Sequence, residues 1–198
     1  MKISCSLQDS YNNEFRYNFI HHNQRLGTGY GVLLNRADAL IEYNYFDDNR
    51  HSITGSGRLN TSYIIRYNVF GKNSLNYVID MHNITDEMLN KDIAGSKIEI
   101  YNNTFYTEED GSIVIHGDPI QKAIIKNNIF YKKESKAMLL KCKKQKIEKS
   151  GNLFLKTANK KKNEASPNRK LIKSKVILDK INTHSFENVY SDLKDDKD

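Results

Sequence analysis

The chain of 198 residues contains no tryptophan, two prolines, two cysteines and only ten glycines. Cys5 and Cys142 lie far apart and match no metal-binding or redox spacing, so the sequence predicts neither a disulfide framework nor a zinc site built on cysteine. No stretch approaches the roughly 18 apolar residues of a membrane span, and the first fifteen residues lack the apolar segment of a signal peptide. These absences favour a single elongated, soluble domain, and the chain as given starts almost directly in patterned sequence, as a fragment of a longer protein would.

The positive charge is unevenly placed. The formal net charge is +7, and the segment 132–149 carries eight lysines against Glu134 and Glu148. We interpret this segment as a solvated face or end of the fold, because lysine stems pack along apolar surface while their amines stay in water. The charge also permits anionic partners such as acidic glycans or nucleic acid.

A repeat dominates the chain. An asparagine followed two residues later by a large apolar residue recurs six times, with one interruption of an otherwise regular spacing of 24 to 26 residues. A period in this range is typical of solenoids. The asparagines are Asn18, Asn44, Asn68, Asn103, Asn128 and Asn152.

The residues before each asparagine alternate between apolar and polar. Positions five and three residues ahead of it are apolar in the regular coils and are expected to face inward, whereas the residue two before it is expected to face outward. The predicted inward residues are Ala39, Ile41, Tyr63, Ile65, Ile98, Ile100, Ala123 and Ile125; the predicted outward residues are Arg16, Glu42, Arg66, Tyr101 and Lys126.

A second short apolar run follows each motif after a polar corner, so every period holds at least two strands. Stacking such coils satisfies each strand edge with the next coil and buries a continuous core. An asparagine at the same bend of every coil can bond its counterparts above and below, so we interpret the column as structural. The sequence therefore predicts an all-β fold, a right-handed single-stranded parallel β-helix of about six coils.

This pattern, over residues 11–157, resembles the right-handed β-helix repeats of pectate lyases, polysaccharide epimerases and NosD-like proteins. The resemblance implies a secreted or cell-surface protein that acts on or holds a polysaccharide. The fold alone does not choose an activity, because this scaffold carries many.

Two segments depart from the repeat. The longer spacing between Asn68 and Asn103 indicates an insertion at 82–95, where Asp86 to Leu89 are expected to form a short helix. Residues 1–157 are assigned to the β-helix and 158–198 to a basic linker, a capping segment at Leu171–Ile181 and a frayed acidic tail from Ser191, since a solenoid end needs covering.

Unusual polar residues gather on the second strands of three consecutive coils: Arg50 with His51, Asp80 with His82, and His116. If Ile79 and Met81 face the core, Asp80 and His82 face out. Aligning Ile79 with Ile115 then sets His116 beside Asp80. These five residues are the candidate catalytic set, and Tyr30, Asn35, His22 and Arg58 are the candidate substrate-binding residues. His21 at the first corner and His184 in the tail are weaker candidates.

Several chemistries fit this set. In β-elimination of a uronate, His82 or His51 would take the proton beside the carboxylate and Arg50 would neutralise the acid. Glycoside hydrolysis would need a second carboxylate facing Asp80, from Asp47, Asp48 or Asp118. A divalent metal could instead bind Asp80, His82 and His51 or His116, although no cofactor is required by the sequence.

The glycine-rich stretches at Gly27–Gly31 and Thr54–Gly57 do not connect a strand to a helix as phosphate loops do, so they favour tight corners that a long ligand can approach. The leading function is a polysaccharide lyase or epimerase-like enzyme acting on an acidic glycan. The alternatives are a non-catalytic glycan-binding or adhesin-type β-helix and, third, nucleic-acid binding through the basic part.

Overall fold

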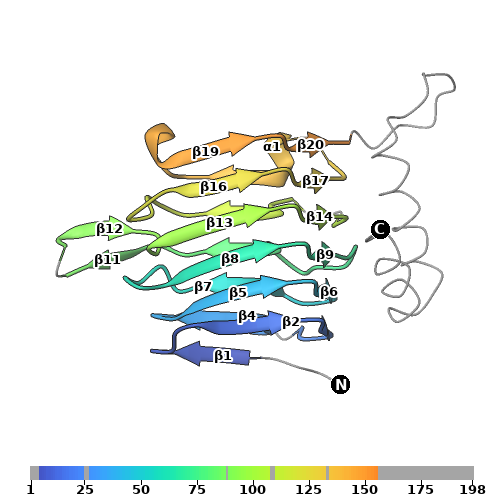
Figure 1. Cartoon of the computed structure of the whole chain (residues 1–198), viewed down its shortest axis with the longest axis horizontal. Coiled ribbons are helices and arrows are strands. Elements are labelled where there is room, and N and C mark those ends of the chain that lie inside the picture. The colour runs from blue at the N-terminus through green and yellow to red at the C-terminus, as the bar shows by residue number, and fades with distance from the viewer. Residues whose placement is uncertain (1–4, 25–26, 88, 108–109, 133, 156–198) are drawn as a thin grey trace, which may run out of the picture. The chain divides into compact units, whose positions relative to one another are not determined.

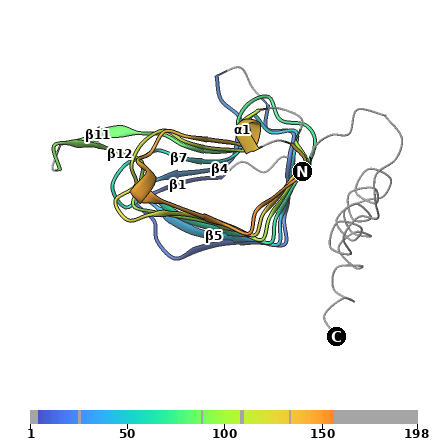
Figure 2. The ribbon, with the colours of Figure 1, turned by 90° about the horizontal axis from the view of Figure 1, so that it is seen from above.

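The computed structural model describes residues 5–24, 27–87, 89–107, 110–132 and 134–155. In this part of the chain, three parallel sheets of six strands each are stacked as a β-solenoid of about six coils (Figure 1). Each coil contributes one strand to every sheet, so the predicted solenoid is confirmed and each period holds three strands instead of the minimum of two. Seen along the stack, the sheets form the sides of the cross-section (Figure 2).

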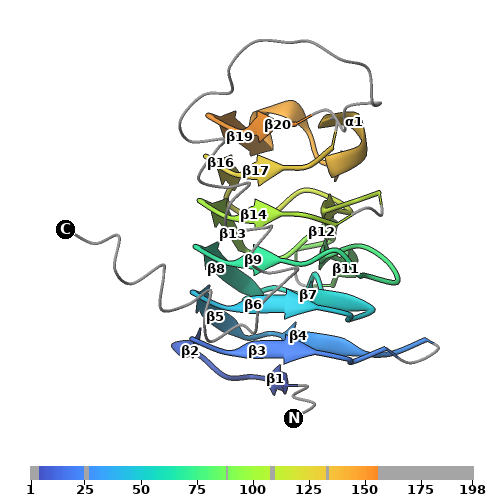
Figure 3. The same cartoon turned by 90° about the vertical axis from the view of Figure 1, so that its right-hand side faces the viewer.

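We name the sheets A, B and C in the order in which the chain enters them. Sheet A consists of β1 (Cys5–Gln8), β4 (Tyr30–Asn35), β7 (His51–Gly55), β10 (Ile79–Met81), β15 (Ile113–Ile115) and β18 (Met138–Leu140). Sheet B consists of β2 (Asn13–Arg16), β5 (Asp38–Glu42), β8 (Ser62–Arg66), β13 (Lys97–Tyr101), β16 (Ala123–Lys126) and β19 (Ile147–Ser150). Sheet C consists of β3 (Phe19–His21), β6 (Tyr45–Asp47), β9 (Val69–Phe70), β14 (Thr104–Phe105), β17 (Ile129–Phe130) and β20 (Leu153–Phe154), which Figure 3 shows one above another.

The core lies between the sheets, at the predicted inward positions. All eight of those residues, from Ala39 to Ile125, are at most 4% exposed. Sheet C adds a column of phenylalanine rings in which Phe70, Phe105 and Phe130 stack with centroids 4.7 Å apart. Of the predicted outward residues, Glu42 is also buried, because Arg16 and Arg66 both pair with its carboxylate.

The asparagine column is a hydrogen-bonded ladder. Each side-chain oxygen from Asn44 to Asn152 accepts both the backbone N–H and the side-chain amide of the asparagine one coil earlier, at 2.9 to 3.1 Å. The residue before each asparagine has a positive φ, between 54° and 63°. The chain therefore bends sharply at this point in every coil, and the ladder satisfies polar groups that the bend buries.

The insertion after β10 is a strand pair, and the predicted helix at Asp86–Leu89 is wrong. Strands β11 (Ile84–Asp86) and β12 (Lys91–Ile93) pair antiparallel with each other and with no other strand of the described chain. The Asp86 carboxylate accepts the N–H of Leu89 at 3.0 Å, which closes a turn where a helix would have continued. The hairpin projects from the corner between sheets A and B (Figure 2).

Helix is scarce in the described residues, with one turn of α1 (Glu134–Ala137) and a 3₁₀ turn at Lys144–Lys146 in the last coil. No helix in this part of the chain is long and apolar enough to cross a membrane. The predicted cap at Leu171–Ile181, the tail from Ser191 and His184 lie outside the described residues.

Candidate functional site

Three neighbouring strands of sheet A, β7, β10 and β15, carry the candidate site. Ile79 pairs with Ile53 on one side and with Ile113 on the other. The predicted alignment of Ile79 with Ile115 is therefore wrong by two residues, because Ile115 is the partner of Met81. His116 and His82 consequently occupy the same position on adjacent coils.

Asp80 is the centre of the site. Its side chain is only 2% exposed, although it alternates with the core residues Ile79 and Met81. The His116 Nε2 donates to Asp80 Oδ1 at 2.9 Å, and His82 Nε2 lies 3.3 Å from Oδ2. The contact that the sequence predicts between Asp80 and His116 thus exists, although the two residues are not paired. Asp80 pairs with Val114, and His116 reaches its carboxylate from two residues further along the chain.

His51 approaches the same carboxylate from the preceding coil. Its side chain is 3% exposed, and its Nε2 lies 3.9 Å from Asp80 Oδ2, beyond hydrogen-bond distance. Its Nδ1 donates to the backbone carbonyl of Tyr77 at 2.7 Å. Burial lowers the pKa of His51, an effect that the Tyr77 carbonyl and Asp80 partly oppose. We call Asp80 and its three imidazoles the His–Asp cluster.

The cluster is buried except on the side of His82 and His116. The neighbouring outward residues Thr54 and Val114 are each 1% exposed, whereas His116 is 20% and His82 49% exposed by side chain. Asp80 therefore meets solvent through the two imidazoles that follow β10 and β15.

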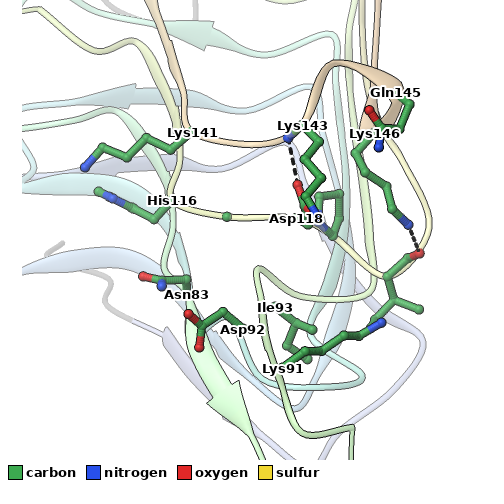
Figure 4. Close-up of a pocket in the computed structure, with 13 residues that line it drawn as sticks. Asn83, Lys91, Asp92, Ile93, His116, Asp118, Lys141, Lys143, Gln145 and Lys146 are labelled. Atoms are coloured by element: carbon green, nitrogen blue, oxygen red, sulfur yellow. Dashed lines mark hydrogen bonds and ion pairs between the residues drawn. The ribbon is translucent and has the colours of Figure 1, made fainter.

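His116 also lines a cavity of about 530 Å³ at the corner between sheets A and B. Leu140 pairs with Ile115, so Lys141 occupies the position beside His116 on the next coil. Figure 4 shows both side chains extending in the same direction, with Asn83 on the other side of His116. Lys91, from β12 of the hairpin, lines the same space, which we call the basic cavity.

The other charges of the basic cavity are engaged. Asp118 accepts the backbone N–H of Lys143 at 2.7 Å, a bond that holds the pKa of its carboxyl below the ordinary value. The Lys146 amine donates to the carbonyl of Ile120 at 2.6 Å, and Asp92 accepts from Thr85. Within the described residues, the amines of Lys91 and Lys141 make no ion pair or hydrogen bond, so they can meet an anionic ligand.

Arg50 and Tyr30 lie at the edge of the cluster. The Arg50 guanidinium donates to the Tyr30 hydroxyl at 3.1 Å and to the Gly27 carbonyl at 3.2 Å. The Tyr30 ring stacks on the His51 ring with centroids 5.6 Å apart. Arg50 thus supports this corner through Tyr30, and its guanidinium has no ion pair with Asp80 in the described residues.

The remaining candidates are dispersed. His22 pairs with Asp48 at 2.9 Å and Arg58 is exposed after β7. Asn35 ends β4, with its Oδ1 buried and without a hydrogen-bond partner. In the described chain, the polar contacts of Asp80 go only to His51, His82 and His116. His22, Arg58 and Asn35 therefore lie outside the cluster.

Sequence reasoning missed Lys91 and Lys141, which it placed in the insertion and in a solvated basic segment. A signal for Lys141 was present: it follows Leu140 as His116 follows Ile115 and His82 follows Met81. No comparable signal pointed to Lys91, because its position depends on a hairpin outside the repeat.

Fold and site together define a parallel β-solenoid with a buried carboxylate–imidazole cluster beside a basic cavity. No protein-family model, no curated protein and no solved structure matches the chain.

Proposed function

We propose that the protein binds an acidic glycan rich in uronate residues and cleaves it by β-elimination, as its resemblance to pectate lyases and polysaccharide epimerases implies. The observation that carries the proposal is the basic cavity, which is lined by His116 and by Lys91 and Lys141, two lysines that make no ion pair or hydrogen bond within the described residues. A polyuronate partner also fits a secreted or cell-surface location.

The two lysines supply the charge that the substrate needs. Uronate carboxylates are spaced along the polymer, and Lys91 and Lys141 reach the cavity from the hairpin and the last coil. A fixed cation near the substrate carboxylate lowers the cost of the negative charge that develops when the adjacent carbon loses its proton. The amines therefore serve both binding and the transition state.

His116 serves as the base in this proposal. In β-elimination a base removes the hydrogen from the carbon beside the carboxylate, the bond from the next carbon to the leaving sugar oxygen breaks, and a carbon–carbon double bond forms. Imidazole is the side chain that most often accepts protons near neutral pH. Asp80 fixes the orientation of the His116 ring through the 2.9 Å hydrogen bond.

The binding test compares two double variants of equal charge. Lys91→Gln with Lys141→Gln removes both cavity amines, whereas Lys97→Gln with Lys126→Gln removes two lysines that pair with Glu99 and Glu148 on sheet B. We expect affinity for a polyuronate, measured by calorimetry, to fall about tenfold or more in the cavity variant and to stay within about twofold in the control. An equal loss of affinity in both variants would show that overall charge, and not the basic cavity, accounts for binding.

The activity test follows the unsaturated product by its ultraviolet absorbance. His116→Gln should lower turnover by about 100-fold or more while leaving polyuronate affinity nearly unchanged. Binding without any turnover in the native protein would refute the lyase and support the non-catalytic glycan-binding alternative.

A further inference from the structure

The three side chains Asp80, His82 and His116 present ligand atoms to one point. One oxygen of the carboxylate and one ring nitrogen of each histidine lie within 4.8 Å of one another. Both imidazoles direct the same atom, Nε2, at the carboxylate. A cation that displaces the two Nε2 protons therefore finds two nitrogen ligands and one oxygen ligand already gathered.

His51 gives an independent indication. A carbonyl oxygen only accepts hydrogen bonds, so the Tyr77 carbonyl fixes the hydrogen on Nδ1 and leaves Nε2 of the neutral ring with a lone pair. That nitrogen is buried and faces Asp80 Oδ2 at 3.9 Å. Metal-binding histidines commonly donate their other ring N–H to a carbonyl or carboxylate in this way.

The charge of the cluster points the same way. Burying a carboxylate costs free energy unless a positive charge or donors accompany it. Asp80 has no lysine or arginine partner in the described part of the chain, and its ion contacts are all imidazoles. A divalent cation bound between the carboxylate and the imidazoles balances this buried charge.

We infer that Asp80, His82 and His116 form a binding site for a divalent transition-metal ion of the Zn²⁺ type, with His51 as a fourth, buried neighbour. Imidazole and carboxylate ligands suit Zn²⁺ and related ions, whereas Ca²⁺ and Mg²⁺ prefer all-oxygen sites. Three protein ligands leave a position open on the side where His82 and His116 are exposed, which is the arrangement of catalytic zinc sites.

The metal site goes beyond the proposed function and does not depend on it. With the ion bound, His116 would be a ligand and no longer the base, and the hydroxide formed from a water on the open position would supply the proton acceptor instead. Zinc lowers the pKa of such a water to about 7. The ion then stands at the border of the basic cavity, where a substrate carboxylate would arrive.

The experiment titrates ZnCl₂ into the full chain after treatment with a chelator and follows binding by calorimetry. We expect one zinc ion per chain, and Asp80→Asn, His82→Gln and His116→Gln should each weaken the affinity about 10- to 100-fold or more. Co²⁺ as a second probe should give visible absorption bands of a nitrogen- and oxygen-ligated ion. CaCl₂ in place of zinc should bind far more weakly.

The matched control is His21→Gln with His22→Gln, which removes two neighbouring histidines of another corner and should leave affinity and stoichiometry unchanged. His82 is half exposed, so His82→Gln should keep the native circular dichroism spectrum. The inference is overturned if zinc fails to bind or if His82→Gln and His116→Gln bind it as the native protein does. Zinc binding without polyuronate cleavage would leave the site standing and refute only the proposed function.

Discussion

At the scale of single residues, burial controls the reactivity of Cys142. Its thiol packs against the core, and burial raises its pKa to about 11 from an ordinary value of 9.0. Because a thiol reacts as the thiolate, which forms only as the pH rises towards the pKa, alkylation at pH 8 should be about 100-fold slower than for a thiol of ordinary pKa.

The measurement uses a Cys5→Ser variant, so that iodoacetamide reports on Cys142 alone. We expect the alkylation rate to rise about tenfold per pH unit between pH 8 and 10. The same variant unfolded in urea is the control and should react at the rate of a free thiol. A rate that levels off near pH 9 in the folded protein would contradict the raised pKa.

The four residues of the His–Asp cluster were all among the candidates that the sequence suggested, but their geometry was not predictable. The two-residue period correctly separates Asp80 from the core residues Ile79 and Met81. It does not reveal that Asp80 is buried, since that depends on the imidazoles and the neighbouring outward side chains that cover it. Nor does it fix the register, because Ile113 and Ile115 are equally good partners for Ile79 by pattern alone.

At the scale of elements, the regular strands follow from the repeat, and the insertion does not. Strands in a solenoid have a copy one coil away, so their boundaries and inward faces recur in the sequence. The segment 84–93 has no such copy, and its local residue types fit a helix or a hairpin. Pairing of Ile84 with Ile93 resolves the choice in favour of the hairpin.

The hairpin should therefore be dispensable for folding and needed for glycan binding. Replacing residues 85–92 with Asn-Gly joins Ile84 to Ile93, which already face each other. We expect the thermal midpoint to change by only a few degrees, because β11 and β12 pair only with each other in the described chain. Polyuronate affinity should fall, because Lys91 leaves the cavity.

Zinc affinity is the internal control for this variant. Asp80, His82 and His116 lie outside the replaced segment, so zinc binding should persist. Lys91→Gln separates the loss of charge from the loss of shape. Unfolding of the shortened chain would contradict the independence of the hairpin.

At the scale of the whole solenoid, stability depends on position along the stack, because each coil contacts only its neighbours. Phe105 is fully buried between the rings of Phe70 and Phe130. Phe154 is half-buried and stacks on Phe130 with centroids 5.1 Å apart. Removing an interior ring therefore leaves a cavity with coils on both sides, whereas removing Phe154 affects one side.

Phe105→Ala should lower the free energy of unfolding by about 3–5 kcal/mol, and Phe154→Ala by clearly less. Interrupting the middle of a solenoid also weakens the coupling between its two halves, so the urea transition of Phe105→Ala should broaden or split. Phe154→Ala is the matched control and should keep a single transition of native slope. Circular dichroism in urea measures both the free energy of unfolding and the width of the transition. Equal losses of free energy in the two variants would show that a ring's contribution to stability does not depend on its place in the stack.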